Sequence, residues 1–411
     1  MQDRQLYEQI LGIVLPWSVE RVELNLSGGE VHVHLRHSGQ AKWQCPECAR
    51  TCALHDHGPS RVWRHLDTCQ YQTLLHAAIP RTTCPDHGVQ TVRVPWAEPH
   101  SRFTALFERL AKEWLLVASQ QAVAQRLGLS WDEIHCIMKR AVKRGLERRE
   151  VEGVRYLGVD EKAFRKGHRY VTVVNDLEKG CVLYVAEDRQ TKSLDGFWET
   201  LSTEQIEKIE GVAMDMWDPY VGSTRAHLPD ADEKIVYDKF HVAKHLGEGV
   251  DQVRRGENKI LKASGDERLV GTKYDWLRHP DSFRDNASYR AFCKLRASKL
   301  KTSKAWAMKE QAMALWDYKY VGVARKHFEH WYRWVTRSRL KPMIKKAKML
   351  KNRIENILTY LKHGITNATS ESLNAKIQWV KYTARGFRNI ENFKTAIYFH
   401  CGGLDLSPPP T

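Results

Sequence analysis

The amino-acid sequence predicts a mixed α/β protein that is divided into several domains. Its 411 residues are more than one hydrophobic core usually organises, so we expect two to four domains. From about residue 155 to residue 254, short apolar runs alternate with helical patterns, which is typical of an α/β sheet. Two cysteine-containing turns and a segment of helical periodicity come earlier and indicate two smaller domains.

The balance of charges indicates a polyanionic partner. The chain has a formal net charge of +16 at pH 7. Lysine and arginine side chains that displace counterions from phosphates supply most of the non-specific affinity for nucleic acids, so we expect a nucleic acid to be that partner. A basic surface that serves solubility is the alternative, but it explains a few charges more easily than this excess.

Nothing in the sequence indicates a membrane segment. No apolar run approaches the roughly 18 to 20 residues that a membrane span requires, and the opening Met-Gln-Asp-Arg lacks the apolar core of a signal peptide. We therefore expect a cytoplasmic protein that associates with the nucleoid. Disulfide frameworks are rare in that reducing compartment, so metal binding is the better explanation for several of the nine cysteines.

Residues 1–98 are expected to form a zinc-binding domain. Two turns of the same form, Cys45-Pro-Glu-Cys48 and Cys84-Pro-Asp-His87, each present two ligands that are separated by two residues. Four such ligands satisfy tetrahedral zinc and leave no open position, so we predict a structural, zinc-ribbon-like site. Strands are expected at 19–26, 30–36, 61–67 and 71–80, after a short helix at 6–15. Cys52, His55, His57 and Cys69 compete as ligands, and some cysteines could instead be small buried hydrophobic residues.

Residues 99–152 are expected to form a helix-turn-helix domain. Apolar residues recur with helical spacing in three segments, and Gly128-Leu-Ser130 is a turn whose serine caps the third helix. In a three-helix unit of this kind, the third helix presents its outward residues to DNA. We predict DNA contacts from His135, Lys139 and Arg140, with Lys143 on the same surface. A plain helical linker with a solvated basic face is the alternative.

The stretch from Tyr156 to Asn175 places an acidic residue beside a basic turn. An apolar strand leads to Asp160, and a turn from Arg165 to His168 connects it to a β-rich run. A carboxylate in this position is suited to hold a metal ion that works on a phosphate backbone. We therefore predict that Asp160 is catalytic, and that Lys166 and His168 either hold the scissile phosphate or orient the carboxylates.

Two later segments can supply further carboxylates. Asp215 ends a short apolar strand, and Glu371 lies on a helix whose apolar residues occupy the opposite face. Asn374 and Gln378 share the polar face of Glu371, and Asn374 is a candidate for holding the DNA or a carboxylate. For all three acids, a surface or helix-capping role is the alternative.

Residues 257–356 are expected to be a helical insertion in the α/β domain. Basic residues interleaved with aromatic residues can hold a nucleic-acid backbone and stack on unpaired bases. Most of the tryptophan and tyrosine rings are nevertheless expected to form the core of the insertion. The basic segment 341–353 faces either phosphates or solvent. His241, shortly before the insertion, could position a DNA strand or simply cap a helix.

Several motifs together make the chain resemble the ISL-three family of bacterial insertion-sequence transposases. They are Gly158-Val-Asp-Glu161, Arg165-Lys-Gly-His-Arg-Tyr170, Met214-Asp-Met216, Tyr237-Asp-Lys-Phe-His-Val242, the segment 367–374 and Ala384-Arg-Gly-Phe-Arg-Asn389. The resemblance also covers the cysteine-rich part, so it spans most of the chain in order.

This resemblance implies an RNase H-like, retroviral-integrase-like catalytic domain at 153–256 plus 357–400, in which the first and fourth strands are neighbours. It implies that Asp160, Asp215 and Glu371 form an Asp-Asp-Glu triad that holds two magnesium ions, or manganese, roughly 4 Å apart. The expected activity is binding of terminal inverted repeats in double-stranded DNA, followed by strand cleavage and strand transfer into target DNA. At least two subunits are expected in the synaptic complex.

Two other functions are compatible with these features. One is a DNA-binding regulator that derives from a transposase and has lost catalysis, although the acids of the triad are present. The other is a structure-selective nuclease on the same fold. Such a nuclease would not need the zinc-binding and helix-turn-helix domains to recognise the ends of an element. Residues 401–411 end in a proline-rich segment and are expected to be disordered.

Overall fold

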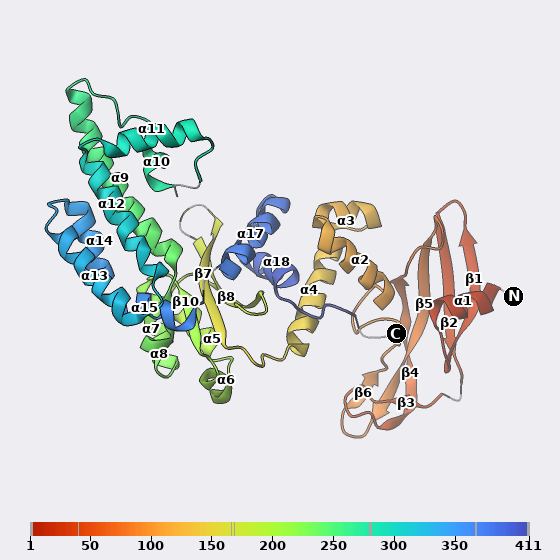
Figure 1. Ribbon diagram of the computed structural model, residues 1–411. Helices are drawn as coiled ribbons and strands as arrows, with labels where there is room; N and C mark the ends of the chain where they lie inside the picture. Colours follow the sequence, from red (N-terminus) through yellow and green to blue (C-terminus); the bar gives the residue numbers. More distant parts are fainter. Residues whose placement is uncertain are drawn as a thin grey trace.

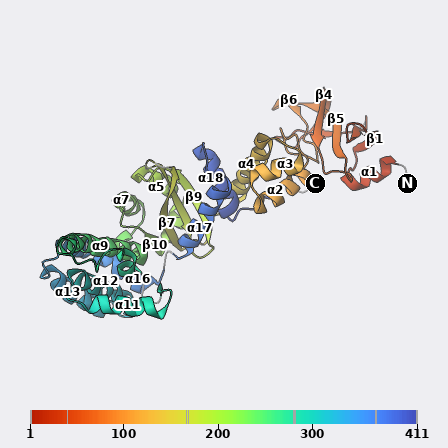
Figure 2. The same ribbon diagram turned by 90° about the horizontal axis from the view of Figure 1, so that it is seen from above.

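A computed structural model describes residues 3–39, 41–165, 167, 169–278, 282–365 and 368–408. The molecule is elongated: an amino-terminal sheet lies at one end, a helical bundle follows, and a second sheet with a large helical layer lies at the other end (Figures 1 and 2). Among the described residues, no helix is long and apolar enough to cross a membrane.

The amino-terminal domain is a six-stranded sheet with the order β1-β2-β5-β4-β3, and β6 pairs with β5. Its elements are α1 (Asp3–Leu11), β1 (Trp17–Asn25), β2 (Glu30–His37), β3 (Trp43–Gln44), β4 (Thr51–Arg64), β5 (Gln72–Cys84) and β6 (Gly88–Thr91). Four buried tryptophans, Trp17, Trp43, Trp63 and Trp96, anchor its core. β4 and β5 are longer than predicted because a shift of register between His57 and Ser60 accommodates the Gly58-Pro59 pair inside the ladder.

Three helices follow the sheet, as predicted: α2 (Ala105–Val117), α3 (Gln120–Leu127) and α4 (Trp131–Arg148). Each begins with a hydroxyl cap, and Ser130 forms a reciprocal capping box with Glu133 at the start of α4. Gly128 ends α3 in the left-handed conformation, at φ 66°, which a glycine adopts without strain.

The carboxyl-terminal tail packs on this bundle instead of being disordered from residue 401. Leu406 is buried in the core of the three helices, together with Phe399. Arg144 donates to the carbonyl of Leu406 at 3.2 Å, and Arg148 pairs with Asp405 at 3.0 Å. The sequence prediction was therefore wrong for the described part, 401–408, because two leucines before the prolines supply apolar contact area. Residues 409–411 lie outside the described residues.

The second sheet has five strands in the order β11-β10-β7-β8-β9. β7 (Tyr156–Arg165), β8 (Arg169–Asp176) and β9 (Cys181–Glu187) are antiparallel, while β10 (Gly211–Met214) and β11 (Ile235–Tyr237) run parallel to β7. The connections contain α5 (Thr191–Trp198), α6 (Thr203–Glu207), α7 (Asp218–His227) and α8 (Ala231–Lys234). Ser202 caps the start of α6 and so separates it from α5.

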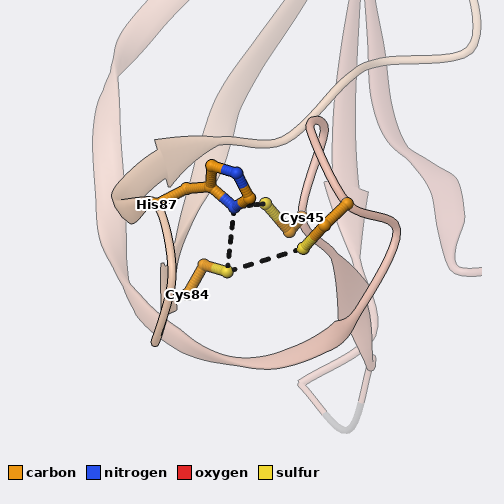
Figure 3. A group of neighbouring side chains, drawn as sticks. Cys45, Cys84 and His87 are labelled. Carbon is orange, nitrogen blue, oxygen red and sulfur yellow. Dashed lines mark hydrogen bonds between the residues drawn. The ribbon is translucent and has the colours of Figure 1, made fainter.

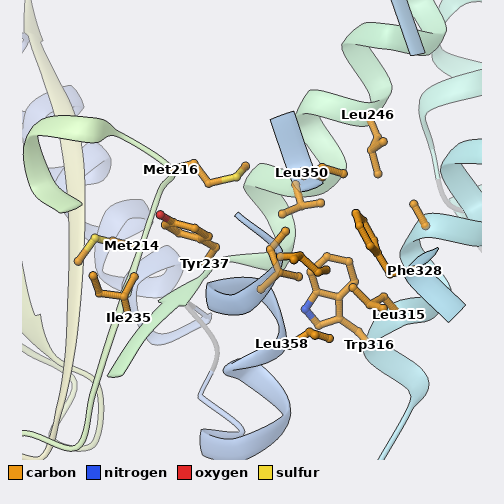
Figure 4. Close-up of a cluster of buried hydrophobic side chains, with 14 of the residues drawn as sticks. Met214, Met216, Ile235, Tyr237, Leu246, Leu315, Trp316, Phe328, Leu350 and Leu358 are labelled. Atoms are coloured by element: carbon orange, nitrogen blue, oxygen red, sulfur yellow. The ribbon is translucent and has the colours of Figure 1, made fainter. Parts of the chain in front are cut away.

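The helical insertion shares one continuous core with this sheet. It comprises α9 (Lys239–Ala263), α10 (Lys273–Leu277), α11 (Asn286–Ala297), α12 (Lys301–Met313), a 3-10 helix (Ala314–Asp317), α13 (Val321–Thr336), α14 (Lys341–Lys351), α15 (Ile354–Leu358) and α16 (Tyr360–His363). Figure 4 shows Met214 and Tyr237 of the sheet region in the same cluster as Trp316 and Phe328 of the insertion. The predicted boundary between residues 256 and 257 thus falls inside α9. Trp316 is a core residue, as we expected for most tryptophan and tyrosine rings of the insertion.

The last two helices return to the sheet. α17 (Ala368–Thr383) lies against β7, and α18 (Ile390–Cys401) packs between β9 and α4. Leu373 and Ile377 of α17 share a buried cluster with Phe164 of β7 and Phe393 of α18. This cluster fixes the helix that carries Glu371 against the strand that carries Asp160.

Candidate functional sites

The two predicted turns bring their four ligands together. Atoms of Cys45, Cys48, Cys84 and His87 all lie within 4.8 Å of one another. Figure 3 shows the side chains of Cys45, Cys84 and His87 pointing toward one another. The Sγ atoms of Cys48 and Cys84 are 3.7 Å apart, and the Cys84 Sγ atom lies 3.5 Å from the Nδ1 atom of His87. Three thiols and an imidazole are donors that zinc prefers, so the cluster fits a closed structural zinc site.

Contacts around the cluster distinguish these four ligands from the other cysteine and histidine residues that were considered as zinc ligands. The hydrogen bond with the His87 ring lowers the pKa of the Cys84 thiol to about 6, which favours the thiolate form that binds metal. Cys52 lies nearby, but its thiol donates to the carbonyl of Arg50 at 3.3 Å. His57 contacts His37, with 2.7 Å between their Nε2 atoms.

The second sheet brings Asp160 and Asp215 to neighbouring positions. β7 and β10 are parallel, and Val159 pairs with Met214, so the next residue on each strand is an aspartate. Both side chains are half-buried. Residues distant in sequence therefore present two carboxylates at one edge of the site.

His241, near the start of α9, contacts Asp215. Its Nδ1 atom lies 3.2 Å from the Asp215 Oδ2 atom, and the Met216 backbone N–H donates to the Oδ1 atom at 2.6 Å. Burial disfavours the charged form of both side chains, but their mutual attraction lowers the pKa of Asp215 and raises the pKa of His241. Asp238, which accepts from the Phe240 backbone N–H, caps the same helix. The carboxylate of Asp215 is thus held in one orientation and kept ionised.

The start of α17 is docked onto the end of β8, and Glu371 follows immediately. Thr369 donates to the carbonyl of Leu177 at 3.1 Å, and the Asn175 side chain donates to Ser370 at 2.9 Å. One turn later, the Asn374 amide donates to the Asp160 carboxylate. Glu371 itself is exposed at this edge.

The three carboxylates do not converge as closely as the cysteine and histidine cluster. Among the described residues, that cluster is the one group of three or more such side chains whose atoms all lie within 4.8 Å of one another. Three like charges repel at short range, which is consistent with the wider spacing of Asp160, Asp215 and Glu371.

Lys162 is a residue of this site that the sequence reasoning missed. It lies two positions after Asp160, so both side chains point to the same face of β7. Burial lowers the pKa of Lys162, while the charges of Asp160 and Glu371 oppose that effect. The intervening Glu161 pairs with Arg189 at 3.2 Å. The period of two along a strand that carries Asp160 was the signal that could have identified Lys162.

The residues of α4 that were predicted to contact DNA differ in their surroundings. Lys139 is exposed, as expected. Arg140 instead pairs at 2.6 Å with Glu108, whose side chain is only 2% exposed, and His135 is half-buried with its ring stacked on Trp131. The prediction that Arg140 and His135 point outward was wrong, because a buried carboxylate requires a charged partner and an exposed indole offers a stacking surface. Lys166 and His168 lie outside the described residues.

Gly158 of β7 allows α17 to approach the strand. A Cβ atom at this position would lie 2.7 Å from the Asn175 Oδ1 atom and 2.9 Å from Leu177 Cδ2, and it would also collide with Ser370. Gly158→Ala is therefore expected to displace the start of α17. We expect the rate of DNA strand cleavage to fall by about 10²-fold, since small misplacements of reacting groups slow a reaction strongly. Activity and thermal unfolding of the variant would be measured together.

Gly222→Ala in α7 is the matched control for this substitution. Its Cβ atom would meet nothing within 4 Å, so we expect unchanged activity and slightly increased stability. Equal activity in the Gly158→Ala variant and the wild type would contradict the idea that the close contact positions Glu371.

Comparison with known proteins agrees with this arrangement. Residues 157–397 match the ISL3-type family model described as a transposase, residues 92–142 match the helix-turn-helix domain of transposase family ISL3, and residues 41–87 match the zinc finger of transposases IS204/IS1001/IS1096/IS1165. The transposase for insertion sequence element IS1001 of Bordetella parapertussis is 29% identical over 399 residues, covering 96% of this chain and 97% of that protein. The transposase for IS1557 of Mycobacterium tuberculosis is 26% identical over 420 residues, covering 95% and 93%.

A zinc-ribbon module, a helix-turn-helix domain and a carboxylate-bearing α/β domain in this order define a DNA-binding transposase. More than half of the chain matches one family model over its α/β domain. The chain belongs to the ISL3 family of insertion-sequence transposases.

Proposed function

We propose that this chain binds the terminal inverted repeats of an insertion sequence and catalyses metal-dependent DNA strand cleavage and strand transfer. The observation that carries the proposal is the register of β7 and β10, which places Asp160 beside Asp215. The Asn374 contact then brings the helix of Glu371 to the same carboxylate. The chemistry would take place at this edge of the sheet, between the three acids.

The strand order supports an RNase H-like catalytic domain. Three antiparallel strands joined by hairpins are followed by two parallel strands, and the first and fourth strands of this series are neighbours. Adjacent first and fourth strands are expected in an RNase H-like sheet. A helical insertion between β11 and α17 then separates the third acid from the first two in sequence.

Asp160, Asp215 and Glu371 are the residues that would hold Mg²⁺ or Mn²⁺, because carboxylate oxygens are the donors that hard divalent cations prefer. A pair of such cations, if bound by these residues, would neutralise charge at the reacting phosphate and activate a water or a 3′ hydroxyl. The chain's own contribution is orientation: His241 holds Asp215, and Asn374 holds Asp160. Lys162 lies on the same face of β7 as Asp160.

Binding of the DNA would be divided among the domains. We assign recognition of the terminal repeats to the zinc module and to α4, through exposed residues such as Lys139. Lys166, His168, His241 and Asn374 would contact the DNA near the scissile phosphate. Joining two ends requires at least two subunits, so we also propose a dimer or larger synaptic complex.

Cleavage of labelled DNA from either side of the gene tests this function. With Mg²⁺, we expect nicks at one fixed position at each end of the element, and no nicks in excess chelator. Binding without cleavage would favour a regulator, and cleavage that ignores the terminal sequence would favour a structure-selective nuclease. Either result would contradict the proposal.

A further inference from the structure

An exposed tyrosine lies on the same face of α17 as Glu371. Tyr382 follows Glu371 by eleven residues, and eleven residues return to within about 20° of the same direction around an α-helix. Gln378, seven residues after Glu371, falls on the other side of that direction by about 20°. The helix therefore presents one continuous stripe from the proposed catalytic carboxylate to Tyr382.

The exposure of Tyr382 is unusual for an aromatic residue. Its side chain is 81% exposed, whereas Phe164 and Leu373, which hold α17 to the sheet, are buried. Together with Gln378, Lys381, Arg385 and Gly386, it lines a hollow of about 590 Å³. No packing role within the described residues accounts for a ring in this position.

The charges around Tyr382 favour a nucleic-acid strand as its partner. Arg385 and Arg388 are exposed in the turn that follows α17. Lys381 in turn donates to the carbonyl of Ala163, which holds this end of the helix against β7. Cations that can contact phosphates beside an exposed ring are the combination that binds unpaired nucleotides, since every base has a face on which an aromatic ring can stack.

We propose that Tyr382 is a stacking platform for an unpaired base of the DNA strand that passes along α17 from the cleavage position. The inference rests on the proposed transposase function. Eleven residues of helix span about 16 Å along its axis. This is roughly the rise of five stacked nucleotides, so the unpaired base lies within about five nucleotides of the cleaved bond.

The test compares two DNA substrates in a cleavage-deficient Glu371→Gln background. Both contain the terminal sequence, but in one the five nucleotides next to the mapped cleavage position are mismatched and therefore unpaired. The parent protein is expected to bind the mismatched DNA more tightly than the fully paired DNA. Tyr382→Ala is expected to weaken binding of the mismatched DNA by roughly 5- to 150-fold, and Tyr382→Phe is expected to retain it, since only the ring is needed.

Tyr320→Ala is the matched control, because this tyrosine is 74% exposed but precedes α13 in the helical insertion. It is expected to bind both substrates like the parent protein. Equal preference in the parent and in Tyr382→Ala would overturn the proposal, as would DNA binding without any preference. A changed oligomeric state of Tyr382→Ala in size-exclusion chromatography would also overturn it, by assigning the ring to a subunit interface. Failure of every protein to bind the terminal DNA would instead refute the transposase function itself.

Discussion

Glu371→Gln is expected to reduce DNA strand cleavage at the element's ends by on the order of 10³-fold or more, with DNA binding unchanged. Glutamine has nearly the same size as glutamate but lacks the negative charge that a divalent cation requires. Glu371 is exposed, so its replacement should leave the fold intact. The measurement is cleavage of labelled terminal DNA beside a gel-shift assay and a thermal melt of the same preparation.

Asp160→Asn tests the other side of the same site. Asp160 accepts from the Glu161 backbone N–H with one oxygen and from Asn374 with the other, and asparagine keeps only one of these acceptors. Loss of cleavage with unchanged DNA binding and an unchanged thermal melt would report the missing charge and not a displaced helix. Glu161→Gln is the matched control, because this neighbouring acid points to the opposite face of β7 and pairs with Arg189. We expect it to retain cleavage within a few-fold. Cleavage by both the Glu371→Gln and Asp160→Asn variants at wild-type rates would remove these acids from the active site.

Much of this site could be predicted because two of its acids directly follow short apolar runs. Asp160 comes after the apolar first half of β7, Asp215 comes after β10, and the parallel pairing of these two runs places the acids side by side. The cysteine and histidine turns were equally recognisable, since their spacing alone implies a shared ion. In both cases, short-range sequence patterns determine the relevant geometry.

Other features depend on contacts between residues that are distant in sequence. Arg140 was predicted to face outward because its own helix gives no sign of Glu108, which lies 32 residues earlier and is buried beneath it. The docking of Ser370 on Asn175 spans 195 residues, across the whole helical insertion. Leu406 in the tail is likewise buried only because it packs against the core of the three-helix bundle, which includes α4. Tertiary contacts of this kind have no local periodicity.

Cys84→Ser is expected to abolish stoichiometric zinc binding and to open one end of the amino-terminal sheet. Structural zinc contributes about 10–16 kcal/mol to small zinc-finger peptides, so loss of one of four ligands removes a large part of the local stability. Zinc content by mass spectrometry and limited proteolysis would measure the effect. Cys69→Ser is the matched control, because Cys69 is exposed and lies outside the cluster.

The unfolding caused by Cys84→Ser is expected to be local. The zinc ligands lie beside β3 and β6, whereas the four buried tryptophans and the pairing of β1, β2 and β5 form a core that does not include these ligands. Protease sites should therefore appear in the turns around Cys48 and His87, while the tryptophan fluorescence of the core persists. DNA binding should weaken as well, if this module helps to read the element's ends. Full zinc occupancy in Cys84→Ser, or loss of zinc in Cys69→Ser, would show that another set of ligands holds the ion.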